Sequence, residues 1–171
     1  MPSYLWKNDE ATCLRNGDER EKGLKKDGKG SIVLQTEIEG GDFGHAGQGS
    51  SQLKETMKKL GIDSQLIKRS AISAYEAEMN VVIHSRQGKM EAIISSDKVI
   101  VSIQDQGSGI EDIEQALRPG YSTASEEVRE MGFGAGLGLS NMKRNADRLF
   151  IESEIGEGTE VEITICLDGS R

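Results

Sequence analysis

Hydrophobic and polar positions alternate clearly over residues 159–167, which predicts a strand with one buried face. Its apolar side holds Val161, Ile163, Ile165 and Leu167. Further strands are predicted at 32–38, 91–96, 98–104 and 149–155, because each segment is rich in apolar or β-branched residues and is bounded by turn residues.

Helical spacing of apolar residues separates these strands. One helix is predicted from Ser50 or Ser51 to about Leu60, and a longer one from about Ser64 to His84. A short helix fits 111–117, and a last one is marked by Leu139, Met142, Ala146 and Leu149. Together these elements predict an α+β fold, a two-layer sandwich of a mixed sheet with helices on one face.

The first 30 residues differ from the rest, because they are rich in charge and glycine and hold few periodic apolar positions. They are predicted to form a disordered leader, with docking of Tyr4-Leu5-Trp6 onto a partner as a further interpretation. One domain is expected over 31–167, followed by a short tail at 168–171.

The 171-residue chain has a formal net charge of −8, which argues against a broad nucleic-acid surface and against binding to anionic membranes. No stretch reaches the roughly 18 apolar residues of a membrane helix, so a cytoplasmic location is expected. Cys13 lies in the polar leader and Cys166 in an apolar strand pattern, so neither a disulfide framework nor a zinc site is expected.

Glu76, Asn80 and His84 are spaced four residues apart and share one side of the long predicted helix, whereas Glu78 points away from them. A carboxylate beside an amide suits phosphoryl transfer, because Glu76 can orient or deprotonate a nucleophile and the Asn80 oxygen can bind Mg²⁺. The alternative is an ordinary solvated helix face.

Asp105 ends a buried strand and is followed by Gly107 and Gly109. A carboxylate in this place can accept a hydrogen bond from an exocyclic amine such as that of adenine, and the glycines let a base approach the backbone. The alternative is an Asx-type turn that closes the strand.

Alternate glycines precede the last predicted helix at Gly132, Gly134, Gly136 and Gly138. A glycine-rich backbone that leads into a helix N-terminus presents N–H groups to phosphate. The spacing matches neither a dinucleotide fingerprint nor a P-loop, and a flexible loop without a ligand is the alternative. The preceding stretch 111–131 is then a lid, in which Arg118 and Arg129 either reach phosphate or are solvated.

Gly156-Glu-Gly158-Thr159 reads as a hairpin turn between the last two strands. In a nucleotide site, this turn is expected to form a wall of the base pocket, with the Thr159 hydroxyl near the adenine.

In order and spacing, these motifs resemble the GHKL superfamily of ATP-binding domains, which includes gyrase, Hsp90-type chaperones, histidine kinases and MutL. Glu76 to Asn80 is similar to the N box, and the three glycine segments are similar to the glycine boxes of that superfamily. Residues 77–84, 138–145 and 149–155 look most like anti-sigma-factor serine/threonine kinases and stressosome switch kinases.

The resemblance implies a Bergerat-type fold that binds ATP and Mg²⁺, with Glu76 as the catalytic base and Asn80 as the metal ligand. It also implies a set of nucleotide-binding residues: Asp105, Gly107, Gly109, Gly132, Gly134, Gly136, Leu137, Gly138 and Thr159.

The expected function is that of an ATP-dependent serine/threonine protein kinase that regulates a partner-switching module. The resemblance implies one of two protein partners: a sigma factor, or a STAS-type protein that antagonises an anti-sigma factor. A homodimer is among the expected assemblies. A non-catalytic ATP-gated binding module, an anti-sigma factor without phosphotransfer, is the alternative.

Overall fold

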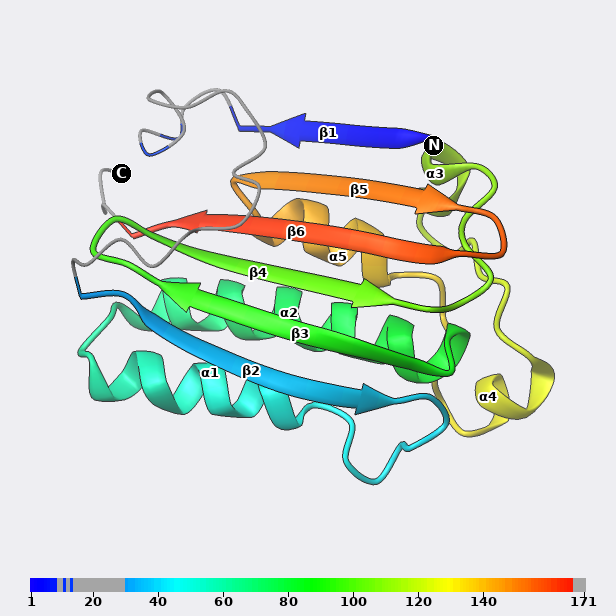
Figure 1. The fold of residues 1–171 in the computed structure, drawn as a ribbon, viewed down its shortest axis with the longest axis horizontal. Coiled ribbons are helices and arrows are strands. Elements are labelled where there is room, and N and C mark those ends of the chain that lie inside the picture. Colours follow the sequence, from blue (N-terminus) through cyan, green and yellow to red (C-terminus); the bar gives the residue numbers. More distant parts are fainter. Residues whose placement is uncertain (9–10, 12, 14–29, 168–171) are drawn as a thin grey trace.

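The computed structural model describes residues 1–8, 11, 13 and 30–167. Within these residues, six strands form one sheet in the order β1-β5-β6-β4-β3-β2 (Figure 1). The strands are β1 (Ser3–Lys7), β2 (Ile32–Glu39), β3 (Gln87–Ile94), β4 (Lys98–Asp105), β5 (Arg148–Glu154) and β6 (Gly158–Cys166). The helices are α1 (Gln48–Lys59), α2 (Ser64–His84), α3 (Ile113–Ala116), α4 (Glu126–Glu130) and α5 (Gly138–Asn145).

Helices α1, α2 and α5 cover one face of the sheet, which confirms the predicted two-layer α+β sandwich (Figure 1). The sheet is not mixed as expected, because each of its strand pairs is antiparallel. The reason lies in the connections. Two helices, α1 and α2, separate β2 from β3 and return the chain to the end of β2, where the Gly40 N–H bonds the Arg86 carbonyl at 2.8 Å.

The hydrophobic core lies between the sheet and these three helices. Val161, Ile163 and Ile165, the alternating residues of β6, are buried there as predicted. The largest apolar side chains with almost no exposed surface come from both layers: Leu53, Met57, Met90, Met142, Leu149, Ile151, Ile163 and Ile165.

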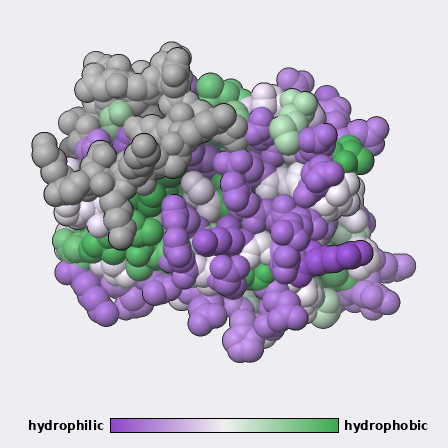
Figure 2. Space-filling model, viewed as in Figure 1, coloured by the Kyte–Doolittle hydropathy of each residue, from purple (hydrophilic) through white to green (hydrophobic). Residues whose placement is uncertain are grey.

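The opposite face of the sheet is turned toward the viewer in Figure 2, where hydrophilic side chains cover most of its described part. Cross-strand polar pairs form this surface, for example Gln35 on β2, which donates to Glu91 on β3 at 2.6 Å. One buried and one polar face is the usual pattern of an antiparallel sheet.

The long helix α2 has the predicted bounds. The Asp63 carboxylate caps its N-terminus by accepting hydrogen bonds from the backbone N–H groups of Gln65 and Leu66, which satisfies donors that have no partner within the helix. None of the helices in the described ranges is long and apolar enough to cross a membrane.

Some boundaries differ from the prediction. Strand β3 begins at Gln87, four residues before the expected start, because it pairs with β2 along its full length. Helix α5 ends at Asn145, and Leu149 belongs to β5. The short helix α4 was not predicted from the sequence, because none of its residues is buried and no apolar period marks it. Its cap is Ser125, whose hydroxyl accepts from the Val128 N–H at 3.4 Å.

Strand β1 lies in the segment that was expected to be a disordered leader, and for Ser3–Lys7 that expectation is wrong. The strand pairs with β5, with Tyr4 opposite Ile151 and Trp6 opposite Leu149, and both aromatic side chains pack against the core. Two apolar positions in a polar context are too few to reveal a strand without its partner. Residues 14–29 and the tail 168–171 lie outside the described residues.

Cys13 and Cys166 form a disulfide bond across a sequence separation of 153, with their Cα atoms 5.6 Å apart. The expectation that these cysteines form no disulfide framework is therefore wrong, because the two are joined to each other. The strand register supplies the reason: Lys7 pairs with Arg148, which pairs with Thr164, so the chain leaves β1 beside the end of β6.

Candidate functional site

A cavity of about 1180 Å³ opens at the end of the sheet where β4 ends and β6 begins, between α2, α5 and the segment that joins β4 to α5. It is lined by the catalytic, metal-binding and nucleotide-binding residues that the family resemblance implied: Glu76, Asn80, Asp105, Gly107, Gly109, Gly132, Gly134, Gly136, Leu137, Gly138 and Thr159. Residues that are up to 83 positions apart in the chain (Thr159 and Glu76) thus share one cavity.

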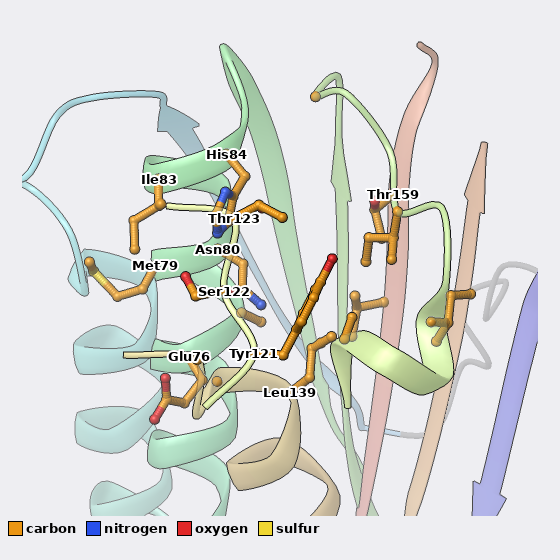
Figure 3. A pocket seen from close by; sticks show the side chains of 18 of the residues that line it. Glu76, Met79, Asn80, Ile83, His84, Tyr121, Ser122, Thr123, Leu139 and Thr159 are labelled. Atoms are coloured by element: carbon orange, nitrogen blue, oxygen red, sulfur yellow. The ribbon is translucent and has the colours of Figure 1, made fainter. Parts of the chain in front are cut away.

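One wall of the cavity is helix α2. Figure 3 shows Glu76, Asn80 and His84 following one another along this helix on the side of the cavity. Glu78 lies on the opposite side, as predicted: it is buried and accepts hydrogen bonds from the backbone N–H groups of Gly49 and Ser50, both at 2.8 Å. The helical period therefore separates a cavity-lining carboxylate from one that anchors the start of α1.

The N-terminus of α5 meets α2 at Glu76 and Asn80. A Cβ atom placed on Gly138 would lie 3.1 Å from the Asn80 Oδ1 and 3.4 Å from the Glu76 Oε2. Glycine at this position therefore leaves both oxygens uncovered, and any larger side chain would fill the space in front of them.

Helix α5 also contacts Glu76 through Asn141, whose Nδ2 donates a hydrogen bond to the Glu76 Oε1 at 2.6 Å. This contact was not predicted from the sequence. The sequence does show that Asn141 precedes Met142, a core residue, and follows Gly138 by three positions. This spacing places Asn141 beside the buried side of the helix, but it does not identify the residue on α2 that Asn141 contacts.

The opposite wall contains Asp105, which is half-buried at the end of β4. Its Oδ1 accepts a hydrogen bond from the Gly107 N–H at 2.7 Å, so the Asx-type turn considered from the sequence is present. Burial raises the pKa of Asp105 above the ordinary value of 3.8, and the hydrogen bond from Gly107 offsets part of this effect.

Thr159 stands near Asp105 on β6. Its hydroxyl lies 2.8 Å from the Ser153 hydroxyl, which accepts from the Ile110 N–H and donates to the Gly158 carbonyl. Gly158 has a φ of 128°, and a Cβ there would overlap the carbonyl oxygen of Asp105. Only glycine therefore lets the β5–β6 hairpin approach the end of β4.

The glycine-rich loop and the segment before it cover the cavity. Figure 3 shows Ser122 and Thr123 crossing in front of α2, and Tyr121 standing between that helix and Thr159. Phe133 of the loop stacks on Phe43 with ring centroids 5.1 Å apart, which ties the loop to the segment before α1.

The two arginines of the predicted lid do not line the cavity. Arg118 is exposed, and Arg129 donates to the Ser122 carbonyl at 2.9 Å. Their sequence-based role as phosphate ligands is therefore not supported in this conformation.

The residues of the cavity suit a nucleotide with a divalent cation. The first turn of α5 has no side-chain cap, so its N–H groups remain available to an anion at the glycine-rich end. Within the described residues no group of three His, Cys, Asp or Glu side chains forms a metal site. An oxygen ligand such as Asn80 together with phosphate oxygens is the kind of set that Mg²⁺ takes.

Comparison with curated proteins gives relatives named anti-sigma F factor. The Thermoanaerobacter protein (strain X514) is 39% identical over 101 residues, which cover 56% of this chain and 66% of the relative. The Caldanaerobacter subterraneus protein is 37% identical, covering 60% and 71%, and the Anoxybacillus flavithermus protein is 30% identical, covering 71% and 79%. The match spans slightly less than two thirds of the length of the Thermoanaerobacter relatives.

Among solved structures, the mycobacterial sensor histidine kinase MprB superposes with a TM-score of 0.46 at 15% identity, covering 79% of this chain and 97% of that chain. A protein-family model matches residues 67–169, which contain α2 from Ile67 onward, the three glycine segments and the strands β3 to β6. The chain belongs to the family of histidine kinase-, DNA gyrase B- and HSP90-like ATPases.

Proposed function

We propose that the protein is an ATP-dependent serine/threonine protein kinase that regulates a partner-switching module. One observation carries the proposal: the Glu76 Oε2 and the Asn80 Oδ1 meet at the N-terminus of α5, at the edge of a cavity lined by glycine-rich backbone. A base, a metal ligand and a phosphate-binding helix end at one point are the parts that phosphoryl transfer requires. The names of the curated relatives support a role in sigma-factor control.

In the proposed complex, Asp105 accepts a hydrogen bond from the adenine amine, and Gly107, Gly109 and Thr159 surround the base. The loop with Gly132, Gly134 and Gly136, followed by Leu137 and Gly138, wraps the phosphates. Asn80 would hold Mg²⁺, which supplies neutralisation of phosphate charge when bound.

The chemical step assigned to this chain is a proton transfer at Glu76. A serine or threonine hydroxyl of the partner attacks the terminal phosphorus, and its proton passes to the Glu76 carboxylate as the new P–O bond forms. The bond from phosphorus to the bridging oxygen of ADP breaks, and ADP leaves. Positioning of the two reactants and electrostatic stabilisation of the transferred group together contribute most of the rate in such transfers.

The proposed protein substrate is a STAS-type antagonist, and a sigma factor is the proposed alternative partner of the same module. A homodimer and a cytoplasmic location are further parts of the proposal. The acidic net charge of −8 fits a protein partner better than a polyanionic one.

Incubation with ATP labelled at its γ-phosphate and with candidate STAS proteins tests the proposal. We expect label on a serine or threonine of one candidate, and a strongly reduced rate of labelling when Glu76 is replaced by Gln. ATP binding without transfer to any candidate would favour a non-catalytic module instead.

One observation favours that second candidate. The stacking of Phe133 on Phe43 links the glycine-rich loop to the segment before α1, so a nucleotide bound by the loop can alter the surface that this segment presents. In this case ATP would control partner affinity, and Glu76 would be dispensable for it.

Asp105→Asn is expected to weaken ATP binding by about 1.5–3 kcal/mol, roughly ten-fold or more, because a charge-assisted hydrogen bond to the base is lost. The parent should also bind ATP more weakly as the pH falls. The raised pKa of Asp105 means that it takes up a proton at a pH where an ordinary aspartate is still ionised, and protonation competes with its role as acceptor. Well below the pKa of Asp105, the affinity for ATP should fall by at most about ten-fold per pH unit.

Calorimetric titration from neutral to mildly acidic pH measures both effects. Asp105→Asn is the matched control, since protonation of ATP itself affects both proteins equally. Identical pH dependence in the two proteins, or unchanged affinity in the folded variant, would remove Asp105 from the base pocket.

Asn80→Ala is expected to reduce the dependence of ATP binding on Mg²⁺ while the fold persists, because the side chain lines the cavity and is not part of the core. Titration of ATP with and without Mg²⁺ measures the difference. If the variant retains the full Mg²⁺ effect, the ion is held elsewhere.

A further inference from the structure

A short hydrogen bond links the two helices that form the reactive end of the cavity. The Asn141 Nδ2 on α5 lies 2.6 Å from the Glu76 Oε1 on α2, across a sequence separation of 65. An ionised carboxylate only accepts hydrogen bonds, so the amide nitrogen of Asn141 faces it and donates. The contact is partly buried, which protects it from competing water.

This bond gives the two oxygens of the Glu76 carboxylate different surroundings. Oε1 accepts the hydrogen bond from Asn141, whereas Oε2 lies on the side of Gly138, close to the Asn80 Oδ1. Figure 3 shows Glu76 and Asn80 on helix α2. A carboxylate with one oxygen held has lost its freedom to rotate, and its second oxygen keeps a single direction.

Asn141 is itself held firmly enough to serve as an anchor. Its backbone N–H bonds the Leu137 carbonyl at 2.8 Å, and its carbonyl accepts from the Asn145 Nδ2 at 2.8 Å. The next residue, Met142, has no exposed surface and fixes the rotation of α5 against the core.

We propose that Asn141 is a positioning residue for the base: it holds Glu76 so that Oε2 faces the hydroxyl that attacks the terminal phosphate. The inference rests on the proposed kinase function, and it assigns Asn141 no contact with substrate. Restricting the carboxylate in this way keeps the acceptor of the proton in line with the attacking oxygen, which is the condition for effective general-base catalysis.

Asn141→Leu keeps the size of the side chain and removes the donor. We expect kcat for transfer from γ-labelled ATP to fall about 10- to 100-fold, the effect of losing one hydrogen bond to a charged group. The affinity for ATP should stay within about two-fold, because Asn141 lines the cavity but its side-chain nitrogen is engaged by Glu76. Arg144→Leu, at an exposed position of the same helix that does not line the cavity, is the control and should leave the transfer rate close to that of the parent.

A double variant separates positioning from a general structural effect. If Asn141 acts through Glu76, Asn141→Leu should change the residual rate little when Glu76 is already Gln, because the base is absent. Equal fold-losses in both backgrounds, or a kcat for Asn141→Leu equal to that of the parent, would overturn the proposal and leave the kinase function intact.

Asn141→Asp adds a readout in pH. Two adjacent carboxylates share a proton at low pH and repel one another when both are ionised. The activity of this variant relative to the parent should therefore fall as the pH rises. A ratio that does not change with pH contradicts the assigned role.

The contact is also measurable without transfer. In the ligand-free protein, the NMR resonances of the Asn141 side-chain amide should shift when Glu76 is replaced by Ala, and those of the Asn145 amide should shift less. If the parent phosphorylates no candidate, the proposed function fails, and this measurement still decides on the contact. An Asn141 amide that does not respond to the loss of Glu76 overturns the inference.

Discussion

Glu76→Gln should lower phosphotransfer by roughly 10²–10⁴-fold, the usual contribution of a general base. The substitution keeps the size of the side chain and an oxygen that can still accept from Asn141, so the helix contact survives and the basicity is lost. ATP binding should hold or tighten, because a negative charge near the phosphates is removed. Single-turnover transfer and calorimetric titration measure the two quantities separately.

Glu78→Gln is an informative comparison for this experiment, since it removes a carboxylate two residues away that is buried under α1 and does not line the cavity. We expect it to lower stability and to leave the rate per folded molecule unchanged. Equal transfer rates in Glu76→Gln and the parent would exclude a general-base role, and a parallel loss of binding and rate would make Glu76 a structural residue.

Arg69→Met should destabilise the fold by about 3 kcal/mol, because breaking a buried ion pair leaves one charge uncompensated. Arg69 on α2 donates to the Asp147 Oδ1 at 2.8 Å and to the Asn145 carbonyl at 2.9 Å, and the Asp147 side chain is only 6% exposed. Asp147 keeps the hydrogen bond from the Cys166 N–H at 2.9 Å, which places the loss at the low end of the range.

Thermal denaturation should then show a midpoint lower by roughly 6–12 °C for a chain of this size. Lys68→Met serves as the control, because Lys68 is the exposed neighbour of Arg69 on the same helix and a surface change of this kind stays within about 0.5 kcal/mol. Similar midpoints for the two variants would mean that the ion pair contributes nothing to stability.

The cavity residues were predictable because each motif is a local pattern. Glu76, Asn80 and His84 follow from the helical period alone, and the turn at Asp105 follows from a strand end next to glycines. That these segments meet in one cavity came from their resemblance to a known superfamily, not from the periodicity. The contact from Asn141 had no such signal, because its partner lies on a helix 65 residues away.

Strand β1 likewise could not be predicted from local sequence patterns. Its five residues bury Tyr4 and Trp6 only because β5 is already in place to pair with them. An isolated strand of this length has no stability of its own, so the sequence by itself resembled a disordered segment. The antiparallel direction of β3 likewise depends on α1 and α2 packing as a pair.

The amino-acid sequence alone determined the period of each element, the glycine turns that end them and the chemical groups at the cavity, since these depend on residues a few positions apart. Only the tertiary structure decided which distant groups meet: Asn141 with Glu76, Arg69 with Asp147, and Cys13 with Cys166. Such contacts join residues that are far apart in the chain. Their partners are selected by packing and strand register in three dimensions, which the spacing of residues along the chain does not specify.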